Sequence, residues 1–340
     1  MAKITILGGG TWGVALSRVI TDNGHDLIIW SKIEREIEEL STTHKYKNLP
    51  GFELPAQVKL TMDAKEAVTD RDVLIMAVAS PYVRQTAHLL APFIREGQLI
   101  VNVAKGIEAD SLLTMTGILQ EEIPQCEVAV LSGPSHAEEV CNAMPTTTVI
   151  GAKKKETAEY LQGIFMNPNF RTYISNDMLG IELGASLKNV IALAAGMVEG
   201  LGYGDNTLAA LITRGIAEIT RLGTAMGGHI HTFYGLSGIG DLIVTCASKH
   251  SRNRTAGVYM GQGMTAKEAM DKVQQIVEGV HSTKAAKTLA DKYQVEMPIV
   301  TQVYEIVFND KSVKEAFSDL MNRDGRAEYY GIIWEKDEDQ

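Results

Sequence analysis

Lys188 stands in surroundings that suit proton transfer. On a helix it shares a face with the small residues Gly184, Ala185 and Ala192. Small neighbours let a ligand or a second helix approach the lysine closely. Burial there would lower the lysine pKa, so that the neutral amine becomes available as a general base. The alternative is a lysine whose ammonium reaches the surface along its own methylene stem.

A second lysine, Lys105, comes shortly after an expected strand at residues 99–103. In open α/β sheets, ligands bind at the carboxyl ends of the strands, and Lys105 belongs at that edge. A cation at this position would stabilise negative charge that develops on a substrate oxygen.

The segment 235–240 is rich in glycine and leads into Asp241. Its glycines predict a tight loop that opens a helix. On one interpretation Asp241 caps this helix. On the other, its carboxylate holds a lysine or a substrate hydroxyl. Thr245, one turn further along, would lie on the same helix face.

Ser251, Arg252, Asn253 and Arg254 follow one another in the second half of the chain. An arginine flanked by small hydrogen-bond donors suits a phosphate group, which it binds through bidentate, charge-assisted hydrogen bonds. The alternative is an exposed polar loop without a ligand.

A loop with Gly133, Ser135 and His136 follows the expected strand at 127–131. The glycine and the serine offer backbone and hydroxyl donors to a ligand. His136 is of a type that can act as acid or base. Because two lysines are already available for that task, we expect His136 to have a positioning role.

The glycine cluster near the N-terminus fits the pattern G-x-G-x-x-G with Gly8, Gly10 and Gly13. It follows an expected strand at 4–7 and opens an expected helix at 12–23, which is the context of a dinucleotide-binding loop. Gly8 allows the tight turn, Gly10 the approach of a pyrophosphate, and Gly13 close packing of helix on strand. The pyrophosphate would rest on the helix N-terminus. The alternative is a glycine-rich turn with no ligand.

The second expected strand, at 27–30, ends on Trp30 and is followed by Ser31 and Lys32. A site that takes only NAD usually has an acidic residue here for the ribose 2′-hydroxyl. Ser31 and Lys32 instead favour NADP, or the use of either cofactor, unless Lys32 is merely a surface lysine.

The first half of the chain alternates short β-rich runs with helical patterns, which predicts a doubly wound parallel sheet. A polar segment with prolines, 41–57, is expected to be a long loop that lies over the cofactor. We therefore expect an α/β, Rossmann-type dinucleotide-binding domain at 1–178. The expected strands are 4–7, 27–30, 72–78, 99–103, 127–131 and 146–150.

After about residue 178 the strand signals stop and helical periodicity continues. An all-helical domain at 179–335 is expected to bind the substrate and carry the catalytic lysine. The acidic end, 335–340, reads as a solvated tail. The expected helices are 180–199, 208–226, 265–273, 282–293 and 299–308.

The chain has 340 residues, of which 32 are basic and 42 acidic, so its formal net charge is −10. This charge argues against a nucleic-acid partner bound over a broad basic face, but not against a small phosphorylated substrate.

The longest apolar run, 190–198, is far shorter than the ~20 residues of a membrane span. The chain has three cysteines. Their number is odd and their spacing does not suit a metal site, so we expect free thiols, as in a reducing cytoplasm. His229 and His231 lack a third ligand nearby in sequence, so no metal is expected.

Eight sequence segments, given at the end of this paragraph in chain order, resemble one family over residues 3–320. This family is that of the bacterial NAD(P)-dependent glycerol-3-phosphate dehydrogenases. The resemblance implies interconversion of sn-glycerol 3-phosphate and dihydroxyacetone phosphate, which supplies glycerol 3-phosphate for phospholipids. One departure is Lys32-Ile33, where many relatives have His-Arg. The segments are GGGTWG, AKGIE, LSGPSHAEEV, LKNVIALAAG, GLGYGDN, GIGDLIVTC, HSRNR and VEGVHSTKA.

The resemblance also implies roles for single residues. Lys188 matches the proton acceptor, and Lys105 a lysine that touches both substrate and nicotinamide. Asn189 and Thr245 match residues that eukaryotic relatives place in the active site. The other implied substrate contacts are Gly133, Ser135, Asp241, Ser251, Arg252 and Asn253. The implied cofactor contacts, besides the glycine loop and Lys32, are Thr11, Trp12, Lys105, Ala137, Arg252, Ile276 and Glu278.

Taken together, these residues predict a hydride transfer in which Lys188 exchanges the proton and Lys105 polarises the carbonyl oxygen. Asp241 would orient the two lysines, and Arg252 would clamp the phosphate. Two alternatives remain: another β-hydroxyacid dehydrogenase of the same architecture, and a non-catalytic dinucleotide sensor. We expect a homodimer, as in other two-domain dehydrogenases of this type.

Overall fold

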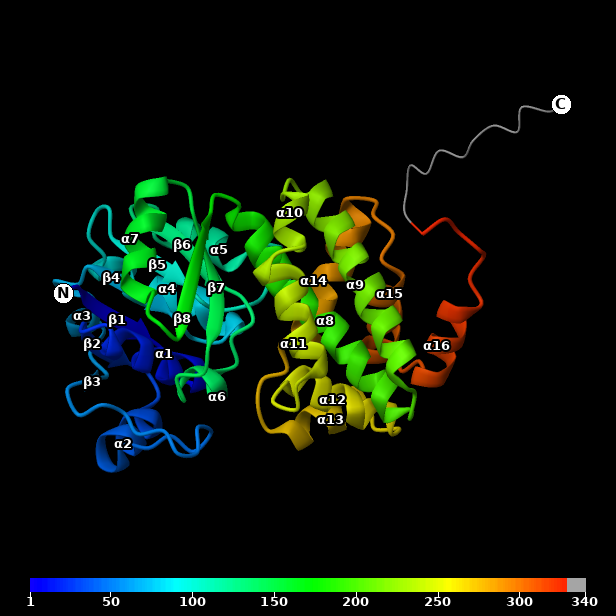
Figure 1. Ribbon diagram of the computed structural model, residues 1–340, viewed down its shortest axis with the longest axis horizontal. Helices are drawn as coiled ribbons and strands as arrows, with labels where there is room; N and C mark the ends of the chain where they lie inside the picture. The colour runs from blue at the N-terminus through cyan, green and yellow to red at the C-terminus, as the bar shows by residue number, and fades with distance from the viewer. Residues whose placement is uncertain (329–340) are drawn as a thin grey trace.

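The protein folds into two lobes, a sheet lobe and a helical lobe, which stand side by side in Figure 1. The structure is a computed structural model and describes residues 1–328. The order of elements confirms the predicted fold class, a Rossmann-type α/β part followed by an all-α part.

One sheet of eight strands, in the order β3-β2-β1-β4-β5-β6-β7-β8, forms the centre of the first lobe. β1 lies between β2 and β4, so the strand order reverses there. In open sheets this reversal opens a crevice at the carboxyl ends of the two strands. The strands are β1 (Lys3–Leu7), β2 (Asp26–Trp30), β3 (Lys59–Thr61), β4 (Val73–Met76), β5 (Leu99–Asn102), β6 (Glu127–Ser132), β7 (Thr146–Ala152) and β8 (Phe170–Ser175).

The predicted doubly wound parallel sheet has one exception, because β6 and β7 run antiparallel. A parallel partner requires a crossover, usually through a helix that covers one face of the sheet. Between Ser132 and Thr146 the chain forms only the short helix α6 (Ala137–Val140). β7 therefore returns alongside β6 in the opposite direction. The strands β3 and β8 were not predicted.

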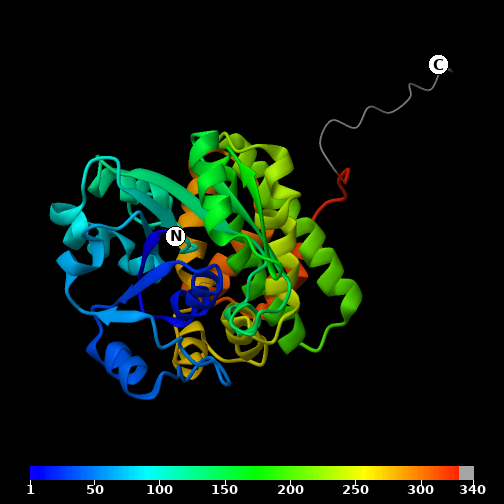
Figure 2. The same ribbon diagram turned by 60° about the vertical axis from the view of Figure 1, so that its left-hand side comes forward.

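Helices cover both faces of the sheet (Figure 2), and each face has its own apolar core. α1, α6 and α7 pack on one face, and α3, α4 and α5 on the other. The strands between them are buried on both sides, which explains their continuous apolar sequence. These elements are α1 (Thr11–Asp22), α2 (Glu34–Thr43), α3 (Ala64–Val68), η1 (Ser80–Tyr82), α4 (Val83–Leu90), η2 (Ala91–Phe93), α5 (Met115–Glu122) and α7 (Lys155–Phe165).

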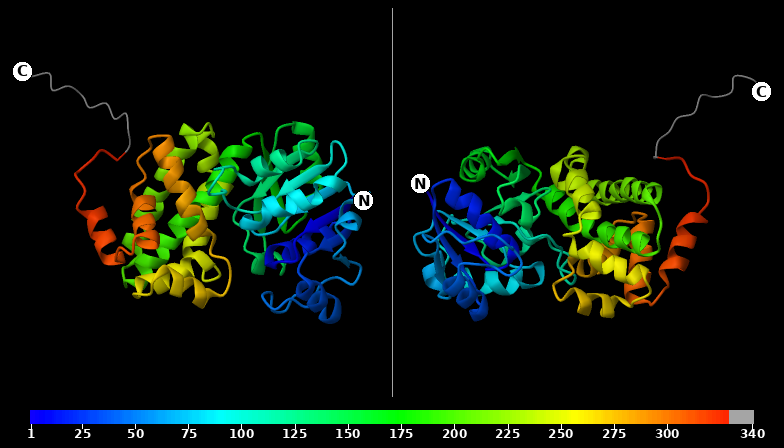
Figure 3. Two further views of the ribbon diagram at one scale, coloured as in Figure 1. Left: turned by 180° about the vertical axis from the view of Figure 1, so that it is seen from behind. Right: turned by 60° about the horizontal axis from the view of Figure 1, so that its bottom comes forward.

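The helix α8 (Met178–Gly200) leads from the sheet lobe into the helical lobe and forms its centre (Figure 3). A Cβ atom at Gly196 would lie 1.9 Å from the carbonyl oxygen of Arg254, so the two backbones touch at this glycine. α8 is long and apolar enough to cross a membrane, but its apolar stretch is entirely buried within the protein. It is the core helix around which the others pack.

The remaining helices surround α8. The sheet ends at Ser175 and α8 begins at Met178. The division into domains at 1–178 and 179–335 stays a prediction. Residues 329–335 of the second domain and the acidic tail at 335–340 lie outside the residues that the structure describes. The helices are α9 (Asp205–Ala225), α10 (Ile230–Phe233), the π-helical turn η3 (Leu236–Gly240), α11 (Asp241–Ala247), α12 (Arg252–Gly261), α13 (Ala266–Val273), α14 (Glu278–Lys292), α15 (Pro298–Phe308) and α16 (Val313–Met321).

Candidate active site

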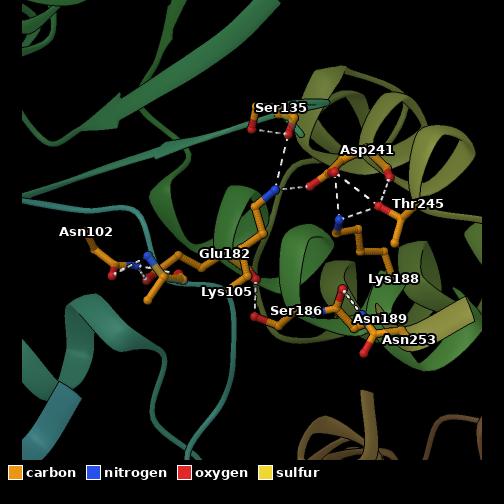
Figure 4. Close-up of polar contacts among 12 residues, drawn as sticks. Asn102, Lys105, Ser135, Glu182, Ser186, Lys188, Asn189, Asp241, Thr245 and Asn253 are labelled. Carbon is orange, nitrogen blue, oxygen red and sulfur yellow. Dashed lines mark hydrogen bonds and ion pairs between the residues drawn. The ribbon is translucent and has the colours of Figure 1, made fainter. Parts of the chain in front are cut away.

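Two lysines from different lobes share one carboxylate (Figure 4). Lys188 donates from Nζ to Asp241 Oδ1 at 2.6 Å, and Lys105 donates to Asp241 Oδ2 at 2.7 Å. Lys188 and Asp241 are buried, with 4% and 2% of their surface exposed. The Lys105 side chain keeps 21% of its surface exposed. The cluster thus has one lysine in the interior and one that is partly exposed.

The turn η3 and helix α11 place Asp241 between the lysines. The interpretation of Asp241 as a helix cap is wrong, because the capping position belongs to Gly240 and Asp241 is the first helical residue. Its side chain is therefore available to the lysines. Thr245 lies one turn further along; its hydroxyl accepts from Lys188 at 2.6 Å and donates to the Asp241 carbonyl at 2.6 Å. The predicted shared face of Asp241 and Thr245 is confirmed.

The buried cluster lowers the pKa of both Lys188 and Asp241. Burial, together with the charge of Lys105, lowers the Lys188 pKa to about 8, although the Asp241 charge opposes this change. For Asp241, burial alone would raise the pKa, but the charges of Lys105 and Lys188 outweigh burial. A lysine with a pKa near neutrality can both accept and return a proton.

The loop after β6 closes over this cluster. The Gly133 carbonyl accepts from Lys105 Nζ at 3.2 Å and from the Ser135 hydroxyl at 3.0 Å. Gly133 has a φ of +141°, and a Cβ atom there would meet the backbone of β7 at 3.0 Å. The position therefore requires glycine. His136, which follows, is half-buried; burial and then the charges of the two lysines lower its pKa.

Asn189 and Asn253, both implied by the resemblance as site residues, also join helices of the second lobe. Asn253 donates to the Asn189 side chain at 3.0 Å and accepts from the Gly279 amide at 2.8 Å, which links α8, α12 and α14. Ser251 is buried and caps α12 by accepting from the Arg254 amide. Arg252, at the start of α12, is exposed, so its guanidinium is free to reach an anionic ligand.

The glycine loop fits a dinucleotide. Gly8 has a φ of +126°, and a Cβ atom there would meet the backbone of Ala77 at 2.9 Å. At Gly13, a Cβ atom would lie 2.2 Å from the Gly8 carbonyl, so the helix packs directly on the turn. A Cβ atom at Gly10 would meet no protein atom within 4 Å. Gly10 also occupies the N-cap position of α1. Because no side chain accepts from the first amides of this helix, these amides can bind a phosphate.

Folding brings an acidic residue to the end of β2, where the sequence has none. Glu36, in the first turn of α2, accepts from the Ser31 hydroxyl at 2.6 Å. Its carboxylate lies against Gly9, 2.9 Å from where a Cβ atom would be. Lys32 is exposed beside it. The end of β2 therefore carries both an acidic and a basic side chain.

The segment after α2 reaches the glycine loop. Residues 41–43 of the predicted loop belong to α2, and the rest forms a compact loop closed by the Leu54 amide, which donates to the His44 carbonyl at 2.7 Å. Asn48 donates from its side chain to the Thr11 hydroxyl at 3.3 Å. Trp12 and Ala137, the other implied cofactor contacts on this side, are half-buried at the starts of α1 and α6.

A direct contact joins the two lobes at Glu278, the first residue of α14. Its carboxylate accepts from the Ser80 amide at 3.2 Å and from the Ser80 hydroxyl at 2.5 Å. Burial raises the pKa of Glu278, and the hydrogen bonds from Ser80 and the charge of Arg252 oppose that rise. Ile276 is half-buried just before this contact. Glu278 and Ile276 thus lie where the helical lobe meets the loop after β4.

Besides Glu36, sequence reasoning missed four residues that form hydrogen bonds around the site: Asn48, Ser80, Asn102 and Glu182. A charged residue within the apolar sequence of α8 was the available signal for Glu182. The other three are ordinary loop or strand-end residues, and their partners lie far away in the sequence.

His229 and His231 lie at the start of α10, and within residues 1–328 no group of three metal-ligating side chains comes together. Cys246 is buried behind Lys188, and burial raises its thiol pKa to about 12. A thiol with so high a pKa is a poor nucleophile, so Cys246 serves as a buried core residue.

Comparisons with known proteins cover nearly the whole chain. Residues 3–158 match the family described as NAD-dependent glycerol-3-phosphate dehydrogenase N-terminus, and residues 177–318 match the corresponding C-terminus. A glycerol-3-phosphate dehydrogenase [NAD(P)+] of Agathobacter rectalis is 54% identical over 98% of this chain and 100% of its own. One from Bacillus subtilis is 48% identical over 95% of both chains.

Among solved structures, glycerol-3-phosphate dehydrogenase from Coxiella burnetii is similar, with a TM-score of 0.91 and 33% identity over 95% of this chain and 99% of its own. Relatives that cover nearly all of this chain thus include a solved structure of similar fold. The chain belongs to the NAD-dependent glycerol-3-phosphate dehydrogenase family.

Proposed function

We propose that this protein is an NAD(P)-dependent dehydrogenase that interconverts sn-glycerol 3-phosphate and dihydroxyacetone phosphate. The observation that carries the proposal is the cluster in which Lys188 and Lys105 donate to the buried Asp241 carboxylate, in a chain of this family that also has a glycine loop fit for a dinucleotide. A protein that only senses the dinucleotide would have no need for two lysines on one buried carboxylate.

Lys188 is the proton-exchanging residue of this proposal. When bound, the nicotinamide supplies or accepts the hydride at the substrate carbon. During oxidation, the neutral Lys188 amine takes the proton of the substrate hydroxyl. During reduction, the Lys188 ammonium returns it. The Lys188 pKa of about 8 lets the same group serve both directions near neutral pH.

Lys105 and Asp241 complete the proton-transfer machinery. Lys105 is the partly exposed lysine of the cluster, so its ammonium is placed to stabilise negative charge on the substrate oxygen. Asp241 accepts from both lysines and fixes them relative to each other. The loop with Gly133 and Ser135 would contact the substrate beside Lys105.

Arg252 would bind the substrate phosphate, with Ser251 and Asn253 beside it. The exposed guanidinium offers bidentate, charge-assisted hydrogen bonds to an oxyanion. Ser251 and Asn253 hold the start of α12 in place through buried hydrogen bonds. Phosphate binding away from the reacting carbon positions that carbon against Lys188.

Turnover of dihydroxyacetone phosphate with NADH or NADPH tests the proposal directly. We expect the cofactor absorbance to fall only when both the enzyme and the phosphorylated substrate are present. Dihydroxyacetone without phosphate serves as the control for the phosphate site. Absence of turnover with both cofactors would refute the proposed function. Faster turnover of a β-hydroxyacid without a phosphate would favour the alternative enzyme class.

We further propose that the enzyme acts as a homodimer in the cytoplasm and supplies glycerol 3-phosphate for phospholipids. The three cysteines are free and buried, which suits a reducing compartment. Light scattering of the purified protein is expected to give twice the mass of the chain, and a monomer at working concentration would contradict the dimer.

A further inference from the structure

Glu182 is a buried carboxyl group to which the proposed reaction assigns no role. It lies in the first part of α8, with 3% of its surface exposed. Burial raises its pKa, and the hydrogen bonds from neighbouring side chains only oppose that rise. Burying a carboxyl group is costly unless its oxygens are fully hydrogen-bonded, so the position calls for an explanation.

The Glu182 carboxyl group reaches from the helical lobe into the sheet lobe. Its Oε1 accepts from the Thr116 amide at 2.9 Å and from the Asn102 side chain at 3.2 Å. Its Oε2 accepts from the Thr116 hydroxyl. Thr116 lies in the first turn of α5, where amides lack partners within the helix. Glu182 thus joins α8 to the start of α5 and to the end of β5.

Asn102 passes this contact on to the segment that carries Lys105. The Asn102 side chain accepts from the Ala104 amide at 3.0 Å and donates to the Ala104 carbonyl at 2.9 Å. Asn102 is itself fully buried. Its amide group therefore fixes both backbone groups of the residue directly before Lys105 (Figure 4).

Glu182 and Lys188 are on the same helix, six positions apart, which corresponds to roughly 9 Å along the axis. A helix is a rigid spacer over this distance. One end of it holds Lys188, and the other end holds, through Asn102, the segment of Lys105. The two lysines come from different lobes, and this connection links the backbone next to Lys105 with the helix that carries Lys188.

We propose that Glu182 is a positioning residue that sets the location of Lys105 relative to Lys188. This inference rests on the proposed function, because it assumes that Lys105 acts on the substrate. Glu182 itself touches neither the reacting atoms nor the cofactor. Its effect on catalysis passes through Asn102 and the 102–105 segment.

The test compares Glu182→Met, which removes the acceptor at nearly the same side-chain length, with Glu182→Gln, which keeps an acceptor for Asn102. For Glu182→Met we expect kcat to fall about 10-fold or more, because misplacement of a reacting group by about 1 Å can cost up to ~10²-fold. KM for the nicotinamide cofactor is expected to change less than 2-fold (about 2-fold being the limit of ordinary assay scatter). Glu182→Gln should retain most of the wild-type kcat.

Glu218 offers a matched control. It is equally buried, with 3% exposed, and accepts from the Ile299 amide at 2.8 Å at the start of α15. Glu218→Met should therefore lower the unfolding temperature and leave kcat unchanged.

If Glu182→Met does not fold, Thr116→Val serves in its place. That variant removes the Thr116 hydroxyl, which donates to Oε2, and should show a smaller loss of kcat, which Thr116→Ser restores.

A double-mutant cycle separates positioning from a purely structural effect. In the Lys105→Ala background, Glu182→Met should cause no further loss of kcat, because its effect passes through Lys105. Additive losses would overturn the inference, as would wild-type kcat in folded Glu182→Met or Thr116→Val, or an equal loss in Glu182→Gln. Inactive wild-type protein would instead refute the proposed function itself.

Discussion

Replacing Asp241 by asparagine removes a negative charge from the centre of the buried cluster and keeps the shape of the side chain. In the wild type, Lys188 and Lys105 donate to the two oxygens of this carboxylate at 2.6 and 2.7 Å. Without the charge, the Lys188 ammonium loses its counter-ion but stays buried near the Lys105 charge. The neutral amine then becomes relatively more stable, so the Lys188 pKa should fall.

The size of this change follows from Coulomb's law. Two unit charges 4 Å apart interact by about 4 kcal/mol at an effective dielectric constant of about 20. Since one pKa unit corresponds to about 1.4 kcal/mol, the loss of Asp241 could lower the Lys188 pKa by up to about 3 units. Relaxation and water entry reduce this effect, so we expect a decrease of at least about one unit from the wild-type value of about 8.

The pH dependence of kcat/KM for glycerol 3-phosphate oxidation measures this pKa, because oxidation requires the neutral amine. In the wild type the rate should rise with pH through about 8. Dihydroxyacetone phosphate reduction, which requires the ammonium, should decline above the same pH. In Asp241→Asn, kcat falls because the lysines lose their alignment, and the rising limb of the residual oxidation moves to lower pH.

Glu218→Gln is the control, since it alters another buried carboxyl group and leaves the lysine cluster intact. Its pH profile should match the wild type. If the rising limb of the Asp241→Asn oxidation profile stays at the wild-type pH, the group that titrates in this profile is not a lysine paired with Asp241. A limb that moves to higher pH would contradict the sign of the argument.

Four further predictions concern other parts of the site and the fold. Lys188→Ala should lower kcat by at least ~10²-fold in both directions; a near-normal kcat in steady-state assays would exclude it as the proton-exchanging residue. Arg252→Ala should raise KM for dihydroxyacetone phosphate with a smaller change in kcat, and an unchanged KM would contradict phosphate binding there. Glu36→Gln should raise the ratio of kcat/KM for NADPH to that for NADH, since Glu36 lies against Gly9 and would repel a 2′-phosphate; an unchanged ratio would place the ribose elsewhere. Burial raises the Glu218 pKa from 4.5 to about 7, so the folded state binds more protons between these values and stability falls as pH rises through them. The free energy of unfolding of Glu218→Gln minus that of the wild type, measured in urea, should therefore be larger at pH 8 than at pH 4.5, by up to about 3 kcal/mol. A difference that does not change with pH would contradict this prediction.

The sequence by itself determined the features that depend on neighbours along the chain. The glycine loop was predictable because Gly8, Gly10 and Gly13 act within one turn that joins β1 to α1. The apolar strands were predictable because burial on both faces leaves a continuous apolar sequence. The family motifs, in their order, marked Lys188 and Lys105 as the residues of interest.

Only the tertiary structure decided how those residues act. The sequence left Asp241 open between a helix cap and a lysine partner, and the fold resolved this by bringing lysines from both lobes to one carboxylate. It also brought Glu36 to the end of β2, turned β7 antiparallel to β6, and connected Glu182 to Asn102. The pKa values follow the same division: residue type sets the ordinary value, but burial and charges brought near by long-range packing set the shift. A local pattern therefore identified the side chains to consider, and the long-range contacts decided which of them lie together.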